Sequence, residues 1–308
     1  MRSPLPFSAE IMSKSKVLVC SNTDREGAAR ALMAAADLES MAGKTVMIKP
    51  NLNTADPAPG STDASTLRTV LGYVMDLSPA KVIVGDRSGP SDTRKVFDDK
   101  GIFAMSRQMG FVPMVFDELQ NSDFVKVESP GMHWRNGFHF ARPVIDADVV
   151  IGLGCIKTHQ FGGHFTMALK LATGCVHRHN MAELHASFIH MRDMIAEINL
   201  AYKPRLIILD GVVTFFRGGP MTGSEWKAGV SLASSDRVAL DATGVALLMM
   251  HGTTKHIQDK GIFEQDQIRR AAELGLGAQN AQSIELVPVD EVSKGAVEKV
   301  SPFLYGKT

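Results

Sequence analysis

The sequence predicts an α/β fold in which helices flank a mostly parallel or mixed central sheet. Short runs of β-branched residues alternate with helix-length segments along nearly the whole chain, and this alternation is typical of βαβ units. The runs 149–153 and 206–209 are continuously apolar, as expected for strands that are covered on both faces. Ligands of open α/β sheets bind beyond the carboxyl ends of the strands, so we expect the functional site at that edge.

In the N-terminal half, short apolar runs predict strands, and the alanine-rich or amphipathic segments between them predict helices. Ser91 is expected to cap a helix, with Asp92 in its first turn. In chain order we expect strand 16–20, helix 26–39, strand 45–49, helix 65–77, strand 81–85 followed by Asp86, the capped helix, and strand 112–116.

The C-terminal half continues the same alternation, after a more irregular region. The run 147–153 is expected to be the central buried strand, because residues 149–153 are continuously apolar. In chain order we expect an extended segment at 137–143, the central strand, a long helix at 181–201, strand 205–209 followed by Asp210, strand 228–233, helix 236–250, helix 264–274 and strand 283–287.

The chain length of 308 residues suits a single large domain, which we place at residues 16–308. Residues 1–15 contain no apolar segment of signal-peptide length and are expected to be loosely ordered. Residues around 118–140 form either a small irregular lobe or part of the same domain, and the sequence does not decide between the two.

Charge and cysteine content exclude several functional classes. Lys and Arg together number 33 and so do Asp and Glu, so a broad nucleic-acid or anionic-membrane surface is not expected. No apolar run approaches the ~20 residues of a membrane span. Cys20, Cys155 and Cys175 fit neither a disulfide framework nor a zinc or iron–sulfur site, which favours a cytoplasmic protein. A homodimer is expected only from the general frequency of dimers.

Polar side chains follow several of the expected strands at the point where each strand ends. Lys49 and Asn51 follow one, Asp86 another, Lys157-Thr158-His159 a third, Asp210 a fourth and Ser234 a fifth. The carboxyl ends of parallel strands share one edge, so these side chains are expected to meet in one site. For Asp86 and Asp210 the alternative interpretation is a turn or a helix cap.

Two lysines and two glycines suggest an anion-binding site. Lys157 and Lys170 could hold a carboxylate or phosphate, or act as desolvated bases; solvated loop lysines are the alternative. Gly218 and Gly219 would let backbone amides approach an anion. No Gly-x-Gly-x-x-Gly or Walker-type motif occurs, so ordinary dinucleotide or nucleotide binding has no motif support.

Six of the ten histidines fall between His159 and His190, which raises the hypothesis of a divalent metal site. The candidate ligands are His159, His164 and His185, although their spacing matches no metal motif and scattered histidines are the alternative. For His159 alone, acid–base work is favoured because an unperturbed imidazole titrates near neutrality.

The chain resembles the domain-of-unknown-function 362 family over about residues 17–287. The motifs that carry the resemblance are Ile48-Lys49-Pro50-Asn51, Val84-Gly85-Asp86, the run 146–151 leading into Lys157-Thr158-His159, Ala168-Leu169-Lys170, Asp210-Gly211, Gly218-Gly219-Pro220 and the run 233–242. The resemblance implies an α/β domain of poorly defined activity. Many relatives carry an appended ferredoxin-like module, which implies redox chemistry for them. Three dispersed cysteines cannot supply that module, so no iron–sulfur cluster is expected and any electron transfer needs an external donor.

These observations together predict an enzyme that acts on a small anionic molecule by lysine and histidine acid–base chemistry, with a redox-linked reaction left open. The catalytic candidates are His159, Lys157, Asp86 and Asp210; the substrate-binding candidates are Lys49, Asn51, Thr158, Lys170, Gly218, Gly219 and Ser234. Two alternatives remain: a metal-dependent enzyme that uses the histidines of 159–190, and a non-catalytic protein that binds or delivers a cofactor or metal.

Overall fold

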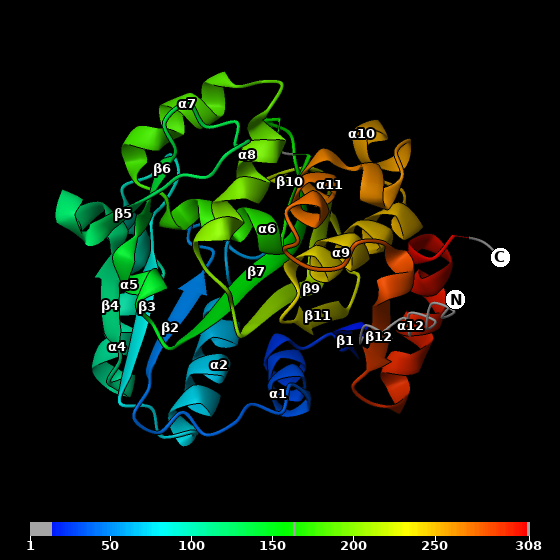
Figure 1. Cartoon of the computed structure of the whole chain (residues 1–308). Helices are drawn as coiled ribbons and strands as arrows, with labels where there is room; N and C mark the ends of the chain where they lie inside the picture. Colours follow the sequence, from blue (N-terminus) through cyan, green and yellow to red (C-terminus); the bar gives the residue numbers. More distant parts are fainter. Residues whose placement is uncertain (1–13, 163, 307–308) are drawn as a thin grey trace, which may run out of the picture.

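The computed structural model describes residues 14–162 and 164–306, which form a ten-stranded mixed sheet with helices on both faces (Figure 1). The strands are β1 (Ser15–Ser21), β2 (Thr45–Pro50), β3 (Lys81–Asp86), β4 (Val112–Val115), β5 (Phe124–Val127), β6 (Phe138–Ala141), β7 (Val149–His159), β8 (His164–Thr166), β9 (Leu206–Gly218), β10 (Gly223–Trp226), β11 (Val230–Ser234) and β12 (Ile284–Pro288). The sheet order is β12-β1-β11-β9-β7-β2-β3-β4, and β8 and β10 are added as hairpin partners of β7 and β9. The predicted α/β sheet is thereby confirmed.

Strand direction decides which strand ends can form one site. Strands β9, β7, β2, β3 and β4 are mutually parallel, so their carboxyl ends meet at one edge of the sheet. Strand β11 runs antiparallel to both of its neighbours, β1 and β9. The carboxyl end of β11 therefore lies at the opposite edge.

Helices cover both faces of the sheet, α1 and α2 on one face and α6, α8 and α9 on the other (Figure 1). The helices are α1 (Arg25–Ala35), α2 (Ala64–Asp76), α3 (Thr93–Asp99), α4 (Ile102–Met109), α5 (Arg142–Ile145), α6 (Ala168–Leu171), α7 (Met181–Ala186), α8 (Met191–Ile198), α9 (Arg237–His251), α10 (Lys255–Gln258), α11 (Asp266–Glu273) and α12 (Glu291–Leu304).

Alternate residues of the central strands enter different hydrophobic clusters. In β9, Leu206 and Ile208 pack with α1 and α2, whereas Ile207 and Leu209 pack with α9. Both faces of the strand are buried, so the continuous apolar runs in the sequence were interpreted correctly. The two-stranded sheet of β5 and β6 contributes Phe138 to a third cluster, which it shares with β2, β3 and β7.

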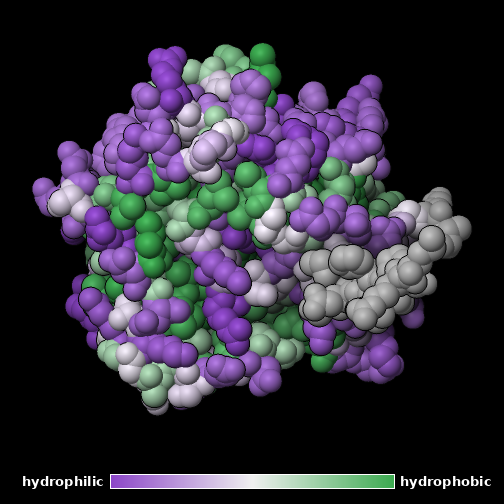
Figure 2. All heavy atoms as spheres, in the orientation of Figure 1, coloured by the Kyte–Doolittle hydropathy of each residue, from purple (hydrophilic) through white to green (hydrophobic). Residues whose placement is uncertain are grey.

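The molecular surface carries both hydrophilic and hydrophobic groups. Hydrophilic residues predominate on the face shown in Figure 2, and hydrophobic residues gather in patches between them. Within residues 14–162 and 164–306, no helix combines the length and the apolarity needed to cross a membrane.

Two predictions near chain and helix starts need correction. Residues 1–13 of the expected loose terminus lie outside the described residues, but Ser15 opens β1 and pairs with Ile284. Ser91 is not the helix cap. Asp92 is the N-cap of α3, because its carboxylate accepts a hydrogen bond from the Lys95 backbone N–H at 2.7 Å.

The central strand is longer than predicted. Strand β7 continues through His159, so Lys157, Thr158 and His159 lie within a strand and not in a loop. Pairing on two sides causes this extension, since Lys157 faces Thr166 of β8 and Phe215 of β9. Strand β9 is extended in the same way and passes through Asp210.

The predicted helix 181–201 is two helices. The backbone leaves the helical conformation at Ser187, with φ −91° and ψ 75°, and α8 begins at Met191. Phe188 and Ile189, in the break between them, are the most exposed large hydrophobic side chains of the described residues, at 82% and 77%. The helix expected over 26–39 is also shorter and ends at Ala35.

Candidate functional site

A cavity of about 500 Å³ opens at the carboxyl ends of β2, β3 and β7, the edge where the sequence predicts the site. Loops after β2 and β3, the distal half of β7, helix α6 and helix α7 form its wall. The polar and charged residues of the wall are Lys49, Asn51, Asn53, Asp86, Arg87, Lys157, His159, Thr166, Lys170, Thr173, Arg178 and His185.

Strand β7 sends every second side chain into the cavity. Cys155, Lys157 and His159 line it, as the two-residue period of a strand requires. Thr158 lies between them and is on the other face, where its hydroxyl donates to the Phe215 carbonyl at 3.2 Å. The substrate-orienting role predicted for Thr158 therefore has no place in this cavity.

Lys157 is a fully buried cation with neutral partners. Its Nζ donates to the carbonyl oxygens of Gly60 and Pro220, the second at 2.9 Å, and no carboxylate contacts it among the described residues. Burial lowers the pKa of Lys157 to about 8. The lysine is therefore mostly protonated at neutral pH and keeps a donor for a ligand.

Lys170 extends from the short helix α6 and is half-buried at the cavity wall. Burial, with a smaller contribution from the nearby charges of Lys157 and Arg87, lowers the pKa of Lys170 to about 8. Within the described parts of the chain, no acceptor lies within hydrogen-bonding distance of its Nζ. A lysine beside another cation is a typical proton acceptor or anion ligand.

Arg87 is a third buried cation, although the sequence analysis did not single it out. Its guanidinium donates to the carbonyl oxygens of Val176, Ser88 and Thr173 at 2.9, 2.8 and 3.1 Å. Burial lowers the pKa of Arg87. Because Arg87 follows Asp86 directly, the positional rule that selected Asp86 could have found it.

Lys49 and Asp86 form a buried ion pair at the cavity wall. Lys49 Nζ and Asp86 Oδ1 are 2.7 Å apart, and each side chain is only 2% exposed. The Asp86 carboxylate also accepts from the backbone N–H groups of Leu52 at 2.6 Å and Arg87 at 2.7 Å. Asp86 thus fixes the loops after β2 and β3 and has little capacity left for a substrate proton.

The cavity wall carries an excess of positive charge. Lys49 is paired with Asp86, and Arg178 is paired with Asp117 at 2.6 Å. Arg87, Lys157 and Lys170 contact no carboxylate in the described residues, so three cations are left without a counterion. Buried unpaired charges are costly to the free protein, and an anionic ligand would relieve that cost.

Four buried polar atoms of the cavity wall have no hydrogen-bond partner among the described residues. They are Asn51 Nδ2, His159 Nδ1, Thr166 Oγ1 and Thr173 Oγ1. A buried polar group without a partner costs free energy, and such groups in native proteins call for a specific explanation. All four atoms belong to residues that line the cavity.

The electrostatic argument for His159 needs correction. Burial lowers the pKa of His159 to about 2, and Lys170, Lys157 and His185 act in the same direction. The imidazole of the free protein is therefore neutral at physiological pH and does not titrate near neutrality. A bound anion would raise this pKa, because negative charge favours the imidazolium form.

The structure does not assemble the predicted metal site. His185 lies with His159 in the cavity wall, whereas His164 stacks on His256 with ring centroids 4.9 Å apart. The ligand atoms of His159, His164 and His185 do not all lie within 4.8 Å of one another, as three ligands of one metal ion would. Residues that are far apart in the sequence can bind one ion only where the fold brings their ligand atoms together.

Asp210 and Ser234 lie outside the cavity. Asp210 pairs with Arg25 of α1 at 2.8 Å, on the face covered by α1. Burial raises the pKa of Asp210, against the effect of Arg25. Ser234 ends the antiparallel strand β11 and donates to the Lys16 carbonyl at 2.6 Å. Strand direction, which the sequence pattern did not reveal, places Ser234 at the opposite edge.

Gly218 and Gly219 form the turn between β9 and β10. Gly219 has a φ of +72°, and a Cβ at that position would lie 2.1 Å from the Thr158 carbonyl oxygen. Neither glycine lines the cavity, but the next residue, Pro220, does and accepts from Lys157. The two glycines therefore shape the wall and do not themselves cradle an anion there.

None of the three cysteine thiols is expected to be reactive in the folded protein. Burial raises the pKa to about 11 for Cys20 and to about 12 for Cys155 and Cys175. Iodoacetamide at pH 7.5 should leave the native mass unchanged and add three carbamidomethyl groups after unfolding in urea. Rapid alkylation of native Cys155 would contradict this and restore it as a nucleophile candidate.

Comparison with known proteins assigns the family. A family model described as Domain of unknown function (DUF362) matches residues 46–246, which include β2, β3, β7, β9 and the lysines of the cavity wall. The chain belongs to this family. The DUF362 assignment confirms the resemblance seen in the sequence.

This DUF362 member is similar to a curated protein and to a solved structure. A thylakoid-associated protein of Synechocystis sp. is 29% identical over 219 residues, which are 69% of this chain and 65% of the relative. The alignment thus spans less than two thirds of that relative. The lactate racemase apoprotein of Thermoanaerobacterium thermosaccharolyticum superposes with a TM-score of 0.48 and 14% identity, covering 97% of this chain and 88% of that one. At that TM-score the likeness carries no argument about function.

Proposed function

We propose that the cavity binds a small organic anion with at least two negative charges and that the protein is an enzyme that transfers a proton on it. The observation that carries the proposal is the set of three cations of the cavity wall, the buried Arg87 and Lys157 and the half-buried Lys170, that contact no carboxylate in the described residues. A monoanion would leave most of this charge uncompensated.

The cavity has the size and lining of a small-molecule site. Its volume of about 500 Å³ lies within the range of ~300–1,000 Å³ that is usual for such sites. Lys157 and Arg87 would hold the charge of the ligand, and Asn51, Thr166 and Thr173 are polar residues of the same wall. The volume also leaves room for an organic cofactor.

Lys170 is the proton acceptor in this proposal. A pKa of about 8, caused mainly by burial and in part by the neighbouring cations, leaves a useful neutral fraction near physiological pH. His159 is neutral in the empty cavity and would gain basicity only when the anion is bound. A reduction with an external electron donor would use the same anion site.

A non-catalytic binding or delivery protein is the second candidate function, because the same cations and polar atoms would serve it. A metal-dependent enzyme based on His159, His164 and His185 is not favoured, since the fold does not converge these residues. The free, buried cysteines support a reducing compartment and hence a cytoplasmic location. A homodimer stays a prediction.

The charge of the ligand can be tested with succinate, succinamate and succinamide, which share one carbon skeleton and carry two, one and no negative charges. Affinity by titration calorimetry at pH 7 should fall by roughly tenfold with each charge removed, or ~1.4 kcal/mol. Succinate is fully ionised above pH 7, so its affinity should decline from pH 7 to pH 10 as Lys157 and Lys170, with pKa values of about 8, lose their protons.

Inorganic phosphate serves as a second dianion in the same titration. Equal affinities for succinate and succinamide, or an affinity for succinate that is constant from pH 7 to pH 9.5, would contradict the proposal. Failure of both succinate and phosphate to bind at millimolar concentration would also contradict it.

A further inference from the structure

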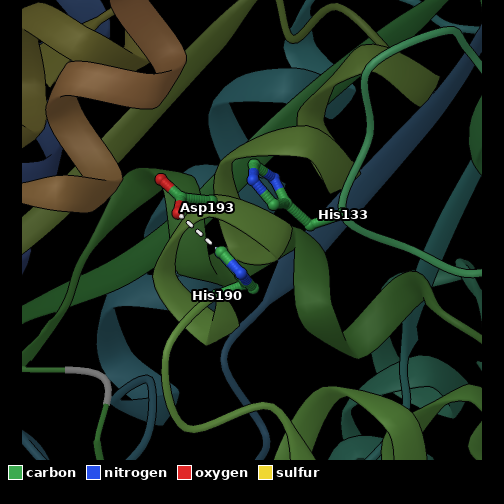
Figure 3. Close-up of side chains that lie close together, drawn as sticks. All are labelled: His133, His190 and Asp193. Atoms are coloured by element: carbon green, nitrogen blue, oxygen red, sulfur yellow. Dashed lines mark ion pairs between the residues drawn. The ribbon is translucent and has the colours of Figure 1, made fainter.

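Outside the cavity, two histidines and an aspartate lie close together at the N-terminus of α8. Figure 3 shows His133, from the segment between β5 and β6, beside His190 and Asp193. One ring nitrogen of each histidine and one carboxylate oxygen all lie within 4.8 Å of one another. We propose that His133, His190 and Asp193 form a binding site for a divalent transition-metal cation, with Zn²⁺ as the probe.

The distances are close to those of a metal site. Two ligand atoms bound to one zinc at 2.0–2.2 Å lie no more than ~4.4 Å apart. His190 Nδ1 and Asp193 Oδ2 are already 3.7 Å apart. The rings of His133 and His190 are stacked, with centroids 4.4 Å apart and planes at 23°, so the His190 ring has to turn before both imidazole lone pairs can meet at one ion. His190 is about half exposed, so a small rotation of its side chain can close the remaining distance.

A buried carboxylate supports the first ligand. Glu197 is fully buried and accepts from His133 twice, from Nδ1 at 2.7 Å and from the backbone N–H at 2.9 Å. Because a carboxylate accepts, Nδ1 carries the proton and Nε2 presents its lone pair. A histidine held in this way by a carboxylate is the usual arrangement of a metal-bound imidazole.

Two arginines of α11 hold the acidic partners in place. Arg270 Nη2 donates to Glu197 Oε1 at 2.8 Å, and Arg269 Nη2 donates to Asp193 Oδ1 at 2.9 Å. These bonds leave Asp193 Oδ2 facing His190. His133 and Asp193 are therefore oriented before any ion binds, which reduces the cost of binding, and His190 is the ligand that has to turn.

The donor atoms select the kind of cation. Two imidazoles and one carboxylate suit Zn²⁺, Co²⁺ or Ni²⁺, whereas Mg²⁺ and Ca²⁺ prefer sites made of oxygen atoms. The two histidines are partly exposed, so solvent can fill the remaining coordination position. Three protein ligands with one position open to solvent are also found in catalytic zinc sites.

A bound cation would connect two segments that are far apart in the sequence. His133 precedes β6, and His190 lies in the break between α7 and α8. Helix α7 ends four residues before His190 and contributes Met181 and His185 to the cavity wall. The cation would therefore restrain the segment between α7 and α8, to which the carboxyl end of α7 is joined.

The test is a calorimetric titration of ZnCl₂ into the tag-free, chelator-treated full chain. We expect one Zn²⁺ per chain, and dissociation constants at least tenfold higher for His190→Ala and Asp193→Asn. His256→Ala is the matched control, because His256 stacks on His164 and is not part of the cluster, and the affinity of this variant should be unchanged. Glu197→Gln should weaken binding by ~10–100-fold if it folds, as shown by circular dichroism.

Three outcomes would overturn the proposal. The first is the lack of stoichiometric Zn²⁺ binding to the unaltered protein. The second is binding that persists unchanged in both His190→Ala and Asp193→Asn. Zinc binding that is lost on replacing His179, which contacts His139 at 3.1 Å, would assign the ion to that other histidine group and would also overturn it.

Discussion

Replacing Lys170 with methionine is expected to weaken succinate binding by about 30-fold or more while leaving the free protein at least as stable. Removing one partner of a desolvated charge pair costs ~2–5 kcal/mol, and 2 kcal/mol corresponds to about 30-fold in affinity. Methionine keeps the length of the aliphatic chain but removes the ammonium group.

Stability should move in the opposite direction to affinity. The pKa of Lys170 falls from its ordinary value of 10.5 to about 8 on folding, so the folded state disfavours the protonated form. The unfolded chain therefore binds more protons between pH 8 and pH 10.5, and the lysine destabilises the fold below that window. Thermal unfolding of Lys170→Met at pH 7 should show an unchanged or higher midpoint.

Lys170→Arg separates binding from proton transfer. Arginine keeps the positive charge but cannot be deprotonated, so it should bind dianions and fail as a base. The readout is proton NMR of a panel of 2-oxo and 2-hydroxy dicarboxylates in D₂O, where loss of a carbon-bound proton signal reports proton transfer. Lys81→Met, which alters an exposed lysine at the start of β3, is the matched control.

The panel also distinguishes the two candidate functions. Exchange by the unaltered protein that disappears in Lys170→Arg supports the enzyme. Binding without exchange on every member of the panel supports a binding or delivery protein. Exchange that survives in Lys170→Met excludes Lys170 as the proton acceptor.

Asp86→Asn is expected to destabilise the fold by ~3–5 kcal/mol, the usual cost of removing one partner of a buried ion pair. Lys49 would be left 2% exposed without its counterion. Asparagine keeps the shape but has only one acceptor oxygen, whereas Leu52 and Arg87 donate to different oxygens of the carboxylate, so one of these two backbone bonds is lost as well. Urea denaturation, followed by circular dichroism, measures the change in the free energy of unfolding.

A matched exposed pair gives the control. Lys95 and Asp99 are also 2.7 Å apart, but both side chains are exposed, so Asp99→Asn should change stability little. Lys49→Met combined with Asp86→Asn should cost less than the sum of the two single changes, because the double variant leaves no buried charge unpaired. A cost for Asp86→Asn no greater than that for Asp99→Asn would show that the buried pair is not a stabilising contact.

Local patterns predicted the fold well. The β-branched runs and alanine-rich segments placed the strands and most helices, because both depend on nearest-neighbour propensity and on periodicity. Element ends were predicted less well. Strand β7 runs on to His159 because β8 and β9 pair with it there, and such pairing depends on residues distant in the sequence.

The candidate site was predicted in part, and the errors have physical causes. The rule that strands end in functional groups placed Lys49, Asn51, Asp86 and Lys157 in one cavity wall because their strands are parallel. The same rule misplaced Ser234, because the direction of a strand cannot be seen in its composition. The unpartnered hydroxyls of Thr166 and Thr173 have no signal in the sequence, since the burial of an atom depends on the whole fold.

The alternation of side chains along β7 has a consequence for how the cavity can change during evolution. Lys157 and His159 share one face only because the spacing between them, and from Val149 onward, is fixed. Single-residue insertions or deletions in this stretch would turn Thr158 inward and move the lysine and the imidazole to the opposite face. The chemistry of the cavity can therefore diversify by substitution at alternate positions of β7. The length of β7, in contrast, is constrained in all descendants that keep the site.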